Sequence, residues 1–402
     1  MNKRLLLLCL LFLSGAAAFS QTFDNLYIEP GFNYGHLTPF DPSHASIGEA
    51  KQWNIDIRIG QQTYGLKRWQ QELNYPSFGL QLDYEHNTLN DAKYIRRNEQ
   101  GEAVTTYEPL GDCIGISGFL NGSFYKSRIW SLDYDIIYGM DIWTRCHNEF
   151  IGARCNFHVS FDLGPTFRLS DRFDLALRYV YIHSSDGAIR LPDYGVNSHN
   201  ARLAVRYRLA EPKETIKKEY EPFAKTWNAF VSEGVGFLQT YTTQGDQIPG
   251  ETPMFFGNTI RVGVTRQFSP KFIWDAGLDF LWTGETKMRY EMLGEPYNFW
   301  RSTHIAASAD FEILFGRFAF CAGLAYYLHH GIYSGTNERK TWGFGSLSEF
   351  EQNHLPQFYT NYYERVGYKL YLGKNNRHYI GTFMKIHLNS IDYIEWTYGI
   401  RL

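Results

Sequence analysis

The chain has 402 residues, a formal net charge of −3 and an aromatic content of 17%, from 29 Tyr, 30 Phe and 10 Trp. A charge this close to zero is not typical of a nucleic-acid-binding protein, so no nucleic-acid partner is expected. The aromatic content is high for a soluble domain and is typical of membrane barrels, which combine aromatic girdles with polar interiors.

Residues 1–20 have the layout of a secretory signal peptide. Basic Lys3 and Arg4 precede an apolar stretch, and small residues lead to a cleavage site expected before Gln21. Cys9 lies within the apolar stretch, too early to become a lipid-anchoring cysteine. No later apolar run approaches the roughly 20 residues that a membrane helix needs. We therefore predict an exported chain that crosses no membrane as a helix.

Long segments of the mature chain alternate apolar and polar residues with a period of two. The clearest are WNIDIRI (53–59), WSLDYDIIYGMDI (130–142) and FHVSFDLGPTFRL (157–169). In each, one face is apolar and the other carries charged residues. This period over ten or more residues predicts long strands. Charges opposite an apolar face favour an outer-membrane antiparallel β-barrel with lipid outside and a polar network inside.

About eight such strands are expected between Asp24 and Leu209. Tight turns near Lys126 and at 169–172 alternate with long links, which is the rhythm of periplasmic turns and extracellular loops. The link at 61–76 breaks this rhythm because it is long on the expected periplasmic side. The long links are 87–109, 143–153 and 186–196.

A charged segment without apolar period, EPKETIKKEYEPFAK (211–225), separates two similar halves. The alternation then restarts, for example in FIWDAGLDFLW (272–282), and the halves end alike in ARLAVRYRL and EWTYGIRL. We predict an all-β chain of two tandem eight-stranded units, because neighbouring strands need only about 2–5 linking residues. One barrel of about sixteen strands is the alternative. The expected divisions are a signal peptide (1–20), a first barrel (21–209), a linker (210–225) and a second unit (226–402).

The four cysteines of the mature chain carry no metal-ligand spacing. Cys146 and Cys155 flank a short connection, so a hairpin disulfide between them is plausible in an oxidising compartment. Cys113 and Cys321 show no related pattern. We expect no metal and no cofactor.

The segment YVYIHSSDGAIRLPDYGVNSHN (179–200) places polar residues where an apolar face should continue. His183 and Ser185 extend the apolar odd-numbered row of their strand, and Asn197 lies on the matching row of the next strand. Since an even-stranded unit has both termini in the periplasm, these residues are expected at the extracellular rim, facing lipid. A nucleophile and a base at that position suit a lipid substrate.

The same residues resemble the lipid A 3-O-deacylase family (PagL-like, acyloxyacyl hydrolase). IHSSDG (182–187) followed by LPDYGVNS (191–198) is similar to its H-x-S-N motif and the downstream P-x-x-G-[IV]-E-S-like segment. WQQELNYPSFGLQLDY (69–84) resembles the bacteroidete branch of the family. The resemblance covers residues of about 24–209. It implies an outer-membrane esterase of a Gram-negative bacterium that removes a 3-hydroxyacyl chain from lipid A of lipopolysaccharide.

The resemblance also implies roles for individual residues. Ser185 would be the nucleophile and His183 its general base, because a serine needs such a base within hydrogen-bond reach. Two positions depart from the family pattern: the asparagine after the serine is Asp186, and the glutamate that orients the histidine is Asn197. Asp186 and Gly187 are candidates for the oxyanion or orienting role, and one hypothesis exchanges the two types, so that Asp186 orients His183 and Asn197 binds the oxyanion.

Two other functions compete with the esterase. A barrel without catalysis could serve as a structural or lipopolysaccharide-binding protein, and a single wide barrel could form a channel. An eight-stranded interior is filled by side chains, so the channel requires the sixteen-stranded alternative. Within the barrels, Asp133, Asp135, Asp275 and Asp279 are expected to pair with lumen arginines rather than to catalyse.

Overall fold

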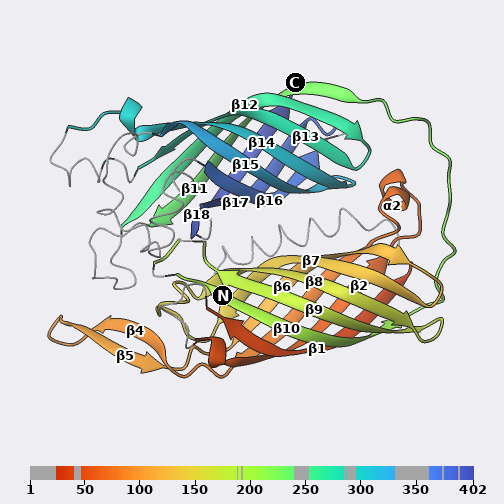
Figure 1. The fold of residues 1–402 in the computed structure, drawn as a ribbon, viewed down its shortest axis with the longest axis horizontal. Helices are drawn as coiled ribbons and strands as arrows, with labels where there is room; N and C mark the ends of the chain where they lie inside the picture. Colours follow the sequence, from red (N-terminus) through yellow and green to blue (C-terminus); the bar gives the residue numbers. More distant parts are fainter. Residues whose placement is uncertain are drawn as a thin grey trace, which may run out of the picture.

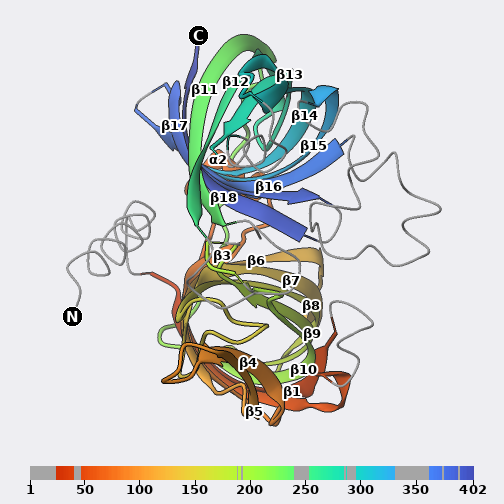
Figure 2. The same ribbon diagram turned by 90° about the vertical axis from the view of Figure 1, so that its left-hand side faces the viewer.

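The computed structural model describes residues 24–39, 47–187, 189–191, 193–239, 253–284, 287, 296–330, 362–373, 375–387 and 390–402. The predicted signal peptide lies outside these residues. The described chain forms two closed antiparallel barrels of eight strands each, which lie side by side (Figures 1 and 2). The prediction of two tandem eight-stranded units is confirmed, and the single sixteen-stranded barrel is wrong.

The first barrel closes by pairing of its first and last strands, and a hairpin of β4 (Ala92–Arg97) and β5 (Ala103–Glu108) extends from one of its ends (Figure 1). This hairpin accounts for the long link at 87–109. The barrel strands are β1 (Leu26–Thr38), β2 (Lys51–Gln62), β3 (Ser77–Asn87), β6 (Cys113–Lys126), β7 (Trp130–Trp143), β8 (Cys155–Arg168), β9 (Phe173–Ser185) and β10 (Val196–Arg208).

The second barrel closes between its own first and last strands, and a short 3-10 helix, η2 (Trp300–Ser302), precedes its fourth strand. Its strands are β11 (Thr226–Gln239), β12 (Met254–Ser269), β13 (Phe272–Thr283), β14 (Thr303–Phe315), β15 (Phe318–His330), β16 (Tyr362–Leu372), β17 (His378–His387) and β18 (Ser390–Arg401).

The period-two pattern separates an apolar outside from a polar inside. Ile55, Leu82 and Ile114 point outward with 51–60% of their surface exposed, while inward Asp56 and Asp83 are 2% and 4% exposed. Successive side chains of a strand point to opposite faces. A shift of the strand register by one residue would therefore turn the charged row outward and the apolar row inward. No helix in the described part of the chain has the length and apolar character to cross a membrane.

Ion pairs fill the interior of the first barrel. Arg58 lies with its guanidinium nitrogens 2.7 Å from Asp162 and 3.0 Å from Asp135. Arg178 lies 3.1 Å from Asp133. A charge removed from water is tolerated when it is paired and hydrogen-bonded. The predicted pairing of Asp133 and Asp135 with lumen arginines is confirmed.

Ion pairs also fill the interior of the second barrel. Arg261 lies 2.8 Å from Asp279, 2.7 Å from Asp310 and 3.4 Å from Asp275. Lys369 adds a second cation to Asp275 at 3.2 Å. The predicted pairing of Asp275 and Asp279 is therefore confirmed as well. Each lumen is occupied by side chains, which removes the basis for a channel.

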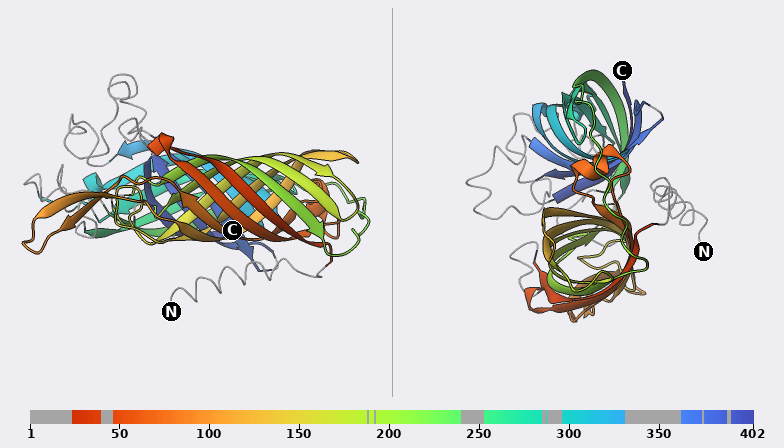
Figure 3. Two further views of the ribbon diagram at one scale, coloured as in Figure 1. Left: turned by 90° about the horizontal axis from the view of Figure 1, so that it is seen from below. Right: turned by 90° about the vertical axis from the view of Figure 1, so that its right-hand side faces the viewer.

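The long link at 61–76 and the charged segment at 211–225 contact one another. The link between β2 and β3 contains α2 (Arg68–Glu72), and the charged linker runs along it between the barrels (Figure 3). Arg68 donates to the Glu221 carbonyl at 2.9 Å, and Ile216 N–H donates to the Tyr64 carbonyl at 2.7 Å. The long turn thus serves as a platform for the linker.

The prediction of a disulfide between Cys146 and Cys155 is wrong. No disulfide joins cysteines within the described residues, and Cys155 begins β8 while Cys146 packs at the edge of an apolar cluster. That cluster covers the end of the first barrel from which the β4–β5 hairpin extends. Its buried members include Leu37, Tyr94, Leu110, Trp143 and Phe150.

Candidate active site

The residues that the sequence singled out lie at one end of two neighbouring strands, β9 and β10. In their register, His183 is opposite Asn197 and Tyr181 is opposite His199. The odd-numbered row of β9 points outward, as Leu177 and Tyr179 show with 42% and 50% exposure. His183 continues this outward row. The strand register therefore places the side chains of His183 and Asn197, which are 14 residues apart in the sequence, next to each other.

His183 is oriented by Asn197. Its Nδ1 lies 2.7 Å from the Asn197 side-chain oxygen, and the Tyr181 hydroxyl donates to the same oxygen at 2.8 Å. An oxygen that accepts both bonds requires the proton of His183 on Nδ1. The Nε2 atom is then left with its lone pair, and it is buried without a hydrogen-bond partner. A neutral histidine in this tautomer can accept a proton at Nε2.

Ser185 follows on the same outward row and is 5% exposed. Its hydroxyl donates to the Asp193 carboxylate at 2.9 Å and accepts from the Gly187 N–H at 3.0 Å. Gly195 separates Ser185 from His183: a Cβ at Gly195 would lie 2.9 Å from His183 Cε1 and 3.2 Å from Ser185 Cβ. The two side chains therefore flank one glycine, with the resting serine hydroxyl turned to Asp193.

In one hypothesis from the sequence, Asp186 orients His183. In the structure, Asp186 contacts the loop after β9 instead. Its Oδ1 accepts from the Arg190 N–H at 3.3 Å, and its own N–H donates to Asp193 at 3.0 Å. The oriented histidine contacts Asn197 instead. Burial, together with the neighbouring Asp193 carboxylate, raises the pKa of Asp186 to about 9. Asp186 is thus a protonated carboxyl that helps to shape the loop after β9.

The second barrel covers this loop. A Cβ at Gly187 would lie 2.5 Å from Ile394 Cδ1, so the β18 side chain packs directly on the glycine. The Leu191 N–H donates to the Gln239 side-chain oxygen at 2.8 Å. Gly187 also has a φ of +71°, a conformation that favours glycine. The loop that holds Ser185 therefore lies between the two barrels.

Aromatic side chains continue the outer surface beside His183. The rings of Tyr181 and Tyr179 lie 5.3 Å and 5.8 Å from the ring of His199, and His36 lies 6.0 Å from it on the other side. The Tyr179 hydroxyl is hydrogen-bonded to His199 Nδ1. These rings present an outward surface that is apolar with polar tips, next to the oriented histidine.

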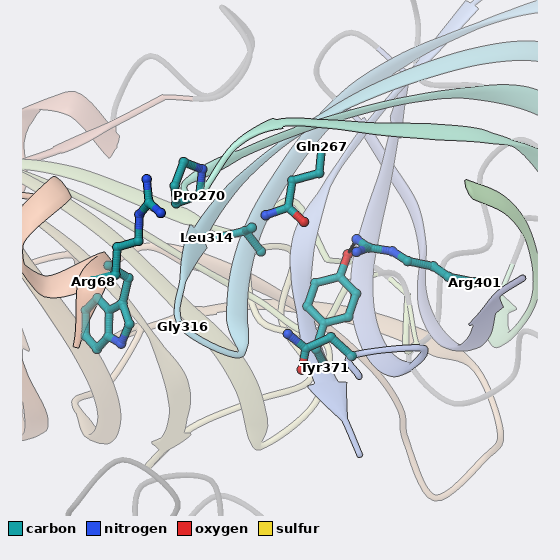
Figure 4. A pocket seen from close by; sticks show the side chains of 9 residues that line it. Arg68, Gln267, Pro270, Leu314, Gly316, Tyr371 and Arg401 are labelled. Carbon is teal, nitrogen blue, oxygen red and sulfur yellow. Dashed lines mark hydrogen bonds between the residues drawn. The ribbon is translucent and has the colours of Figure 1, made fainter. Parts of the chain in front are cut away.

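A hollow of about 220 Å³ lies at the opposite end of the barrels (Figure 4). Arg68 and Trp69 of α2 line one side, and Gln267, Tyr371 and Arg401 of the second barrel line the other. It lies where the strand turns of the second barrel meet the β2–β3 link. His183 and Ser185 lie at the other ends of their strands, so this hollow is separate from the candidate site.

Two residues of the site were not assigned roles from the sequence. The Asp193 carboxylate accepts a hydrogen bond from the Ser185 hydroxyl. Gly195 has no side chain, and this leaves room for Ser185 and His183 on either side of it. Both residues lie within the segment LPDYGVNS, which the sequence analysis had connected with the site. Their roles could not be assigned because they depend on how the loop folds back on β9.

One family model matches part of the chain, within the second unit. The family model described as "Acyloxyacyl hydrolase, C-terminal domain" matches residues 226–343. A search of curated proteins found no match. The match falls on the second unit, whereas the sequence resemblance was drawn on residues of about 24–209.

Solved structures similar to the chain are outer-membrane proteins with distant sequences. They include a NanC porin (6% identity, 94% of this chain and 97% of that chain covered, TM-score 0.15). A Salmonella typhi OmpF complex with daunomycin has 9% identity, covers 94% of this chain and 96% of that chain, and has a TM-score of 0.18. The Pseudomonas aeruginosa siderophore receptor PirA has 9% identity, 94% and 62% coverage, and a TM-score of 0.23.

The family that the sequence resemblance named is thus the one whose model, the acyloxyacyl hydrolase C-terminal domain, matches residues 226–343 of this chain.

Proposed function

We propose that this protein is an outer-membrane esterase that removes a 3-hydroxyacyl chain from lipid A. One observation carries the proposal. His183 donates from Nδ1 to Asn197, which leaves a buried, unpartnered Nε2 beside Ser185 on the outward face of a barrel. The acyloxyacyl hydrolase match in the second barrel supports the same class of reaction.

In the proposed reaction, Ser185 Oγ attacks the carbonyl carbon of the acyl ester and His183 Nε2 takes its proton. The tetrahedral intermediate then collapses, the sugar oxygen leaves with the proton from His183, and an acyl-enzyme remains. Water then gives a proton to the same Nε2 and attacks the acyl carbon; the bond to Ser185 Oγ breaks, Oγ takes that proton back, and the 3-hydroxy fatty acid is released. The Ser185 hydroxyl must first turn from Asp193 to His183. We assign the contact with the oxyanion to the Gly187 N–H, which lies 3.0 Å from Ser185 Oγ.

The same proposal places the barrels across the outer membrane, with the candidate site at the level of the outer leaflet. Two aromatic belts support this position on the first barrel. Trp53 and Tyr84 lie toward the end with the long loops, with ring centroids 5.5 Å apart. Tyr125 and Trp130 lie at the turn end, 5.0 Å apart. Aromatic side chains at two levels around an apolar band are typical of outer-membrane barrels.

Mass spectrometry of lipid A tests the function. Cells that make lipopolysaccharide would express the wild type, His183→Ala, Ser185→Ala or the control His86→Ala. His86 also lies outside the first barrel near the same rim, on β3, but contacts Asp112 rather than the site. We expect loss of one hydroxyacyl mass with the wild type and the control, and intact lipid A with the two site variants.

An unchanged lipid A with a folded wild-type barrel would reject the esterase. The non-catalytic lipopolysaccharide-binding barrel would then be the better function. It would be tested by co-purification of lipopolysaccharide with the wild type. Heat-dependent migration of the barrel in detergent gels would establish folding for every variant.

A further inference from the structure

The lumen of the first barrel contains a second cluster of chemical groups, separate from the candidate active site. Asp83 and Glu85 on β3 and His158 on β8 point inward and are 4%, 2% and 1% exposed. Their ligand-type oxygen and nitrogen atoms all lie within 4.8 Å of one another. Asp141 on β7 adds a third carboxylate, with its Oδ1 3.1 Å from His158 Nδ1.

The charges of this cluster differ from those of the network deeper in the lumen. The deeper carboxylates pair with guanidinium groups, as Asp162 and Asp135 do with Arg58. In the part of the chain that the structure describes, no arginine or lysine forms an ion pair with Asp83, Glu85 or Asp141. One imidazole therefore faces three buried carboxylates, and the cluster lacks compensating positive charge.

Three atoms of the cluster are buried without a hydrogen-bond partner. They are Asp83 Oδ2, Asp141 Oδ1 and His158 Nε2. Gly115 lies between Asp83 and Asp141 in the strand ladder, and a Cβ there would be 2.5 Å from Asp83 Oδ2 and 2.8 Å from Asp141 Oδ1. The two carboxylate oxygens thus converge over a residue that has no side chain. A buried polar atom without a partner costs free energy unless something binds it.

We propose that Asp83, Glu85 and His158 bind a divalent transition-metal ion, with Asp141 beside them as a further oxygen donor. Mixed imidazole and carboxylate ligands suit Zn²⁺ or Mn²⁺, whereas Ca²⁺ and Mg²⁺ prefer oxygen ligands alone. Bonds of about 2.1 Å to a tetrahedral ion bring ligand atoms to roughly 3.4 Å from one another. Small side-chain movements from the present arrangement achieve this.

The surrounding residues support the ligand orientation. Glu85 accepts from Gln52 Nε2 at 2.7 Å and from Asn54 Nδ2 at 3.0 Å. Such partners hold a ligating carboxylate in place and are a regular part of metal sites. The sequence showed no metal-ligand spacing, because the ligands come from two strands that are separated in the barrel by β6 and β7.

The ion would have a structural role behind the candidate active site. His158 is the cross-strand partner of Ser184, whose neighbours are His183 and Ser185. An ion that joins β3 to β8 therefore braces the wall whose outer face carries the site. Binding would stabilise the first barrel whether or not the chain is an esterase.

Metal content and thermal stability test the site. The full chain would be refolded in detergent with Zn²⁺, with Mn²⁺ or with EDTA, then desalted and analysed by elemental mass spectrometry. We expect about one ion per chain and a higher melting temperature for the metal-loaded protein. His158→Gln and Asp83→Asn should weaken binding by about tenfold or more.

His86→Gln is the matched control, because His86 lies on β3 next to Glu85 but on the opposite face. It should retain the metal. Asp83→Asn also separates a binding defect from misfolding: it removes one charge from a crowded anionic cluster, so its metal-free form should be at least as stable as metal-free wild type. Metal bound equally by all three variants, or wild type that retains none, would overturn the proposal. Neither result depends on lipid A hydrolysis.

Discussion

His183 and Asn197 face each other across β9 and β10, with Nδ1 of the histidine 2.7 Å from the amide oxygen of the asparagine. This single contact selects the tautomer that leaves Nε2 available as a base. It also gives Asn197 the orienting position that a carboxylate usually holds in a serine-histidine site. Asn197 supplies the hydrogen bond without the negative charge.

Substitution of Asn197 should therefore separate orientation from charge. We expect Asn197→Ala to lower deacylation by about 10²–10⁴, because His183 loses the acceptor for its Nδ1 proton. Asn197→Asp should retain or raise activity, because a carboxylate also stabilises the imidazolium form. Rates would be measured on purified lipid A in mixed micelles. If Asn197→Ala worked as fast as the wild type, the orienting role would be refuted.

Addition of a single methyl group at Gly195 should disturb the candidate site. Its φ is +71°, and an added Cβ would meet His183 Cε1 at 2.9 Å and the Ser184 carbonyl at 3.1 Å. We expect Gly195→Ala to lower the free energy of unfolding by about 1–3 kcal/mol through strain at this position. It should also displace His183 and abolish most of the activity. Gly101→Ala is the control, since its φ is +83° but no atom lies within 4 Å of its Cβ position. Urea unfolding and lipid A turnover of both variants provide the comparison.

The loop after β9 should open as the pH rises. The pKa of Asp186 is raised to about 9, first by burial and then by Asp193. A raised folded-state pKa means that the folded loop binds more protons than the unfolded one. Its stability is therefore fully present below the unfolded pKa of about 4 and is lost as the pH rises to about 9.

Limited proteolysis would measure this opening. We expect tryptic cleavage after Arg190 to increase between pH 7 and 10, relative to cleavage after exposed Arg97 in the β4–β5 hairpin. The ratio corrects for the pH dependence of trypsin itself. Asp186→Asn, which cannot lose a proton, should flatten the increase. A ratio with the same slope in both proteins would show that another group controls the loop.

Removal of Arg58 should destabilise the first barrel strongly. Its guanidinium lies within 4 Å of four carboxylates, those of Glu29, Asp56, Asp135 and Asp162. Arg58→Met leaves these charges buried without their cation, which we expect to cost about 3–5 kcal/mol. Arg172→Met, at an exposed turn, should cost little. Urea titration in lipid vesicles, followed by tryptophan fluorescence, would report the midpoints. Equal midpoints would show that the network tolerates the loss.

The period-two alternation was enough to predict the barrel class, the outward row of each strand and the pairing of lumen carboxylates with arginines. Alternation reports which face of a strand meets lipid, and the charged face must then find partners inside. The charged segment at 211–225 was sufficient to favour two barrels over one. The residues His183, Ser185 and Asn197 could be placed on one rim because strand register carries them there.

Tertiary structure alone decided what those side chains contact. Asp193 and Gly195 reach Ser185 and His183 through the fold of a loop, and loop geometry has no period in the sequence. The contact of Ile394 with Gly187 joins residues more than 200 positions apart, across two barrels. The cluster of Asp83, Glu85 and His158 likewise arises when β3 and β8 face the same lumen, because closure of a sheet brings together strands that are distant along it.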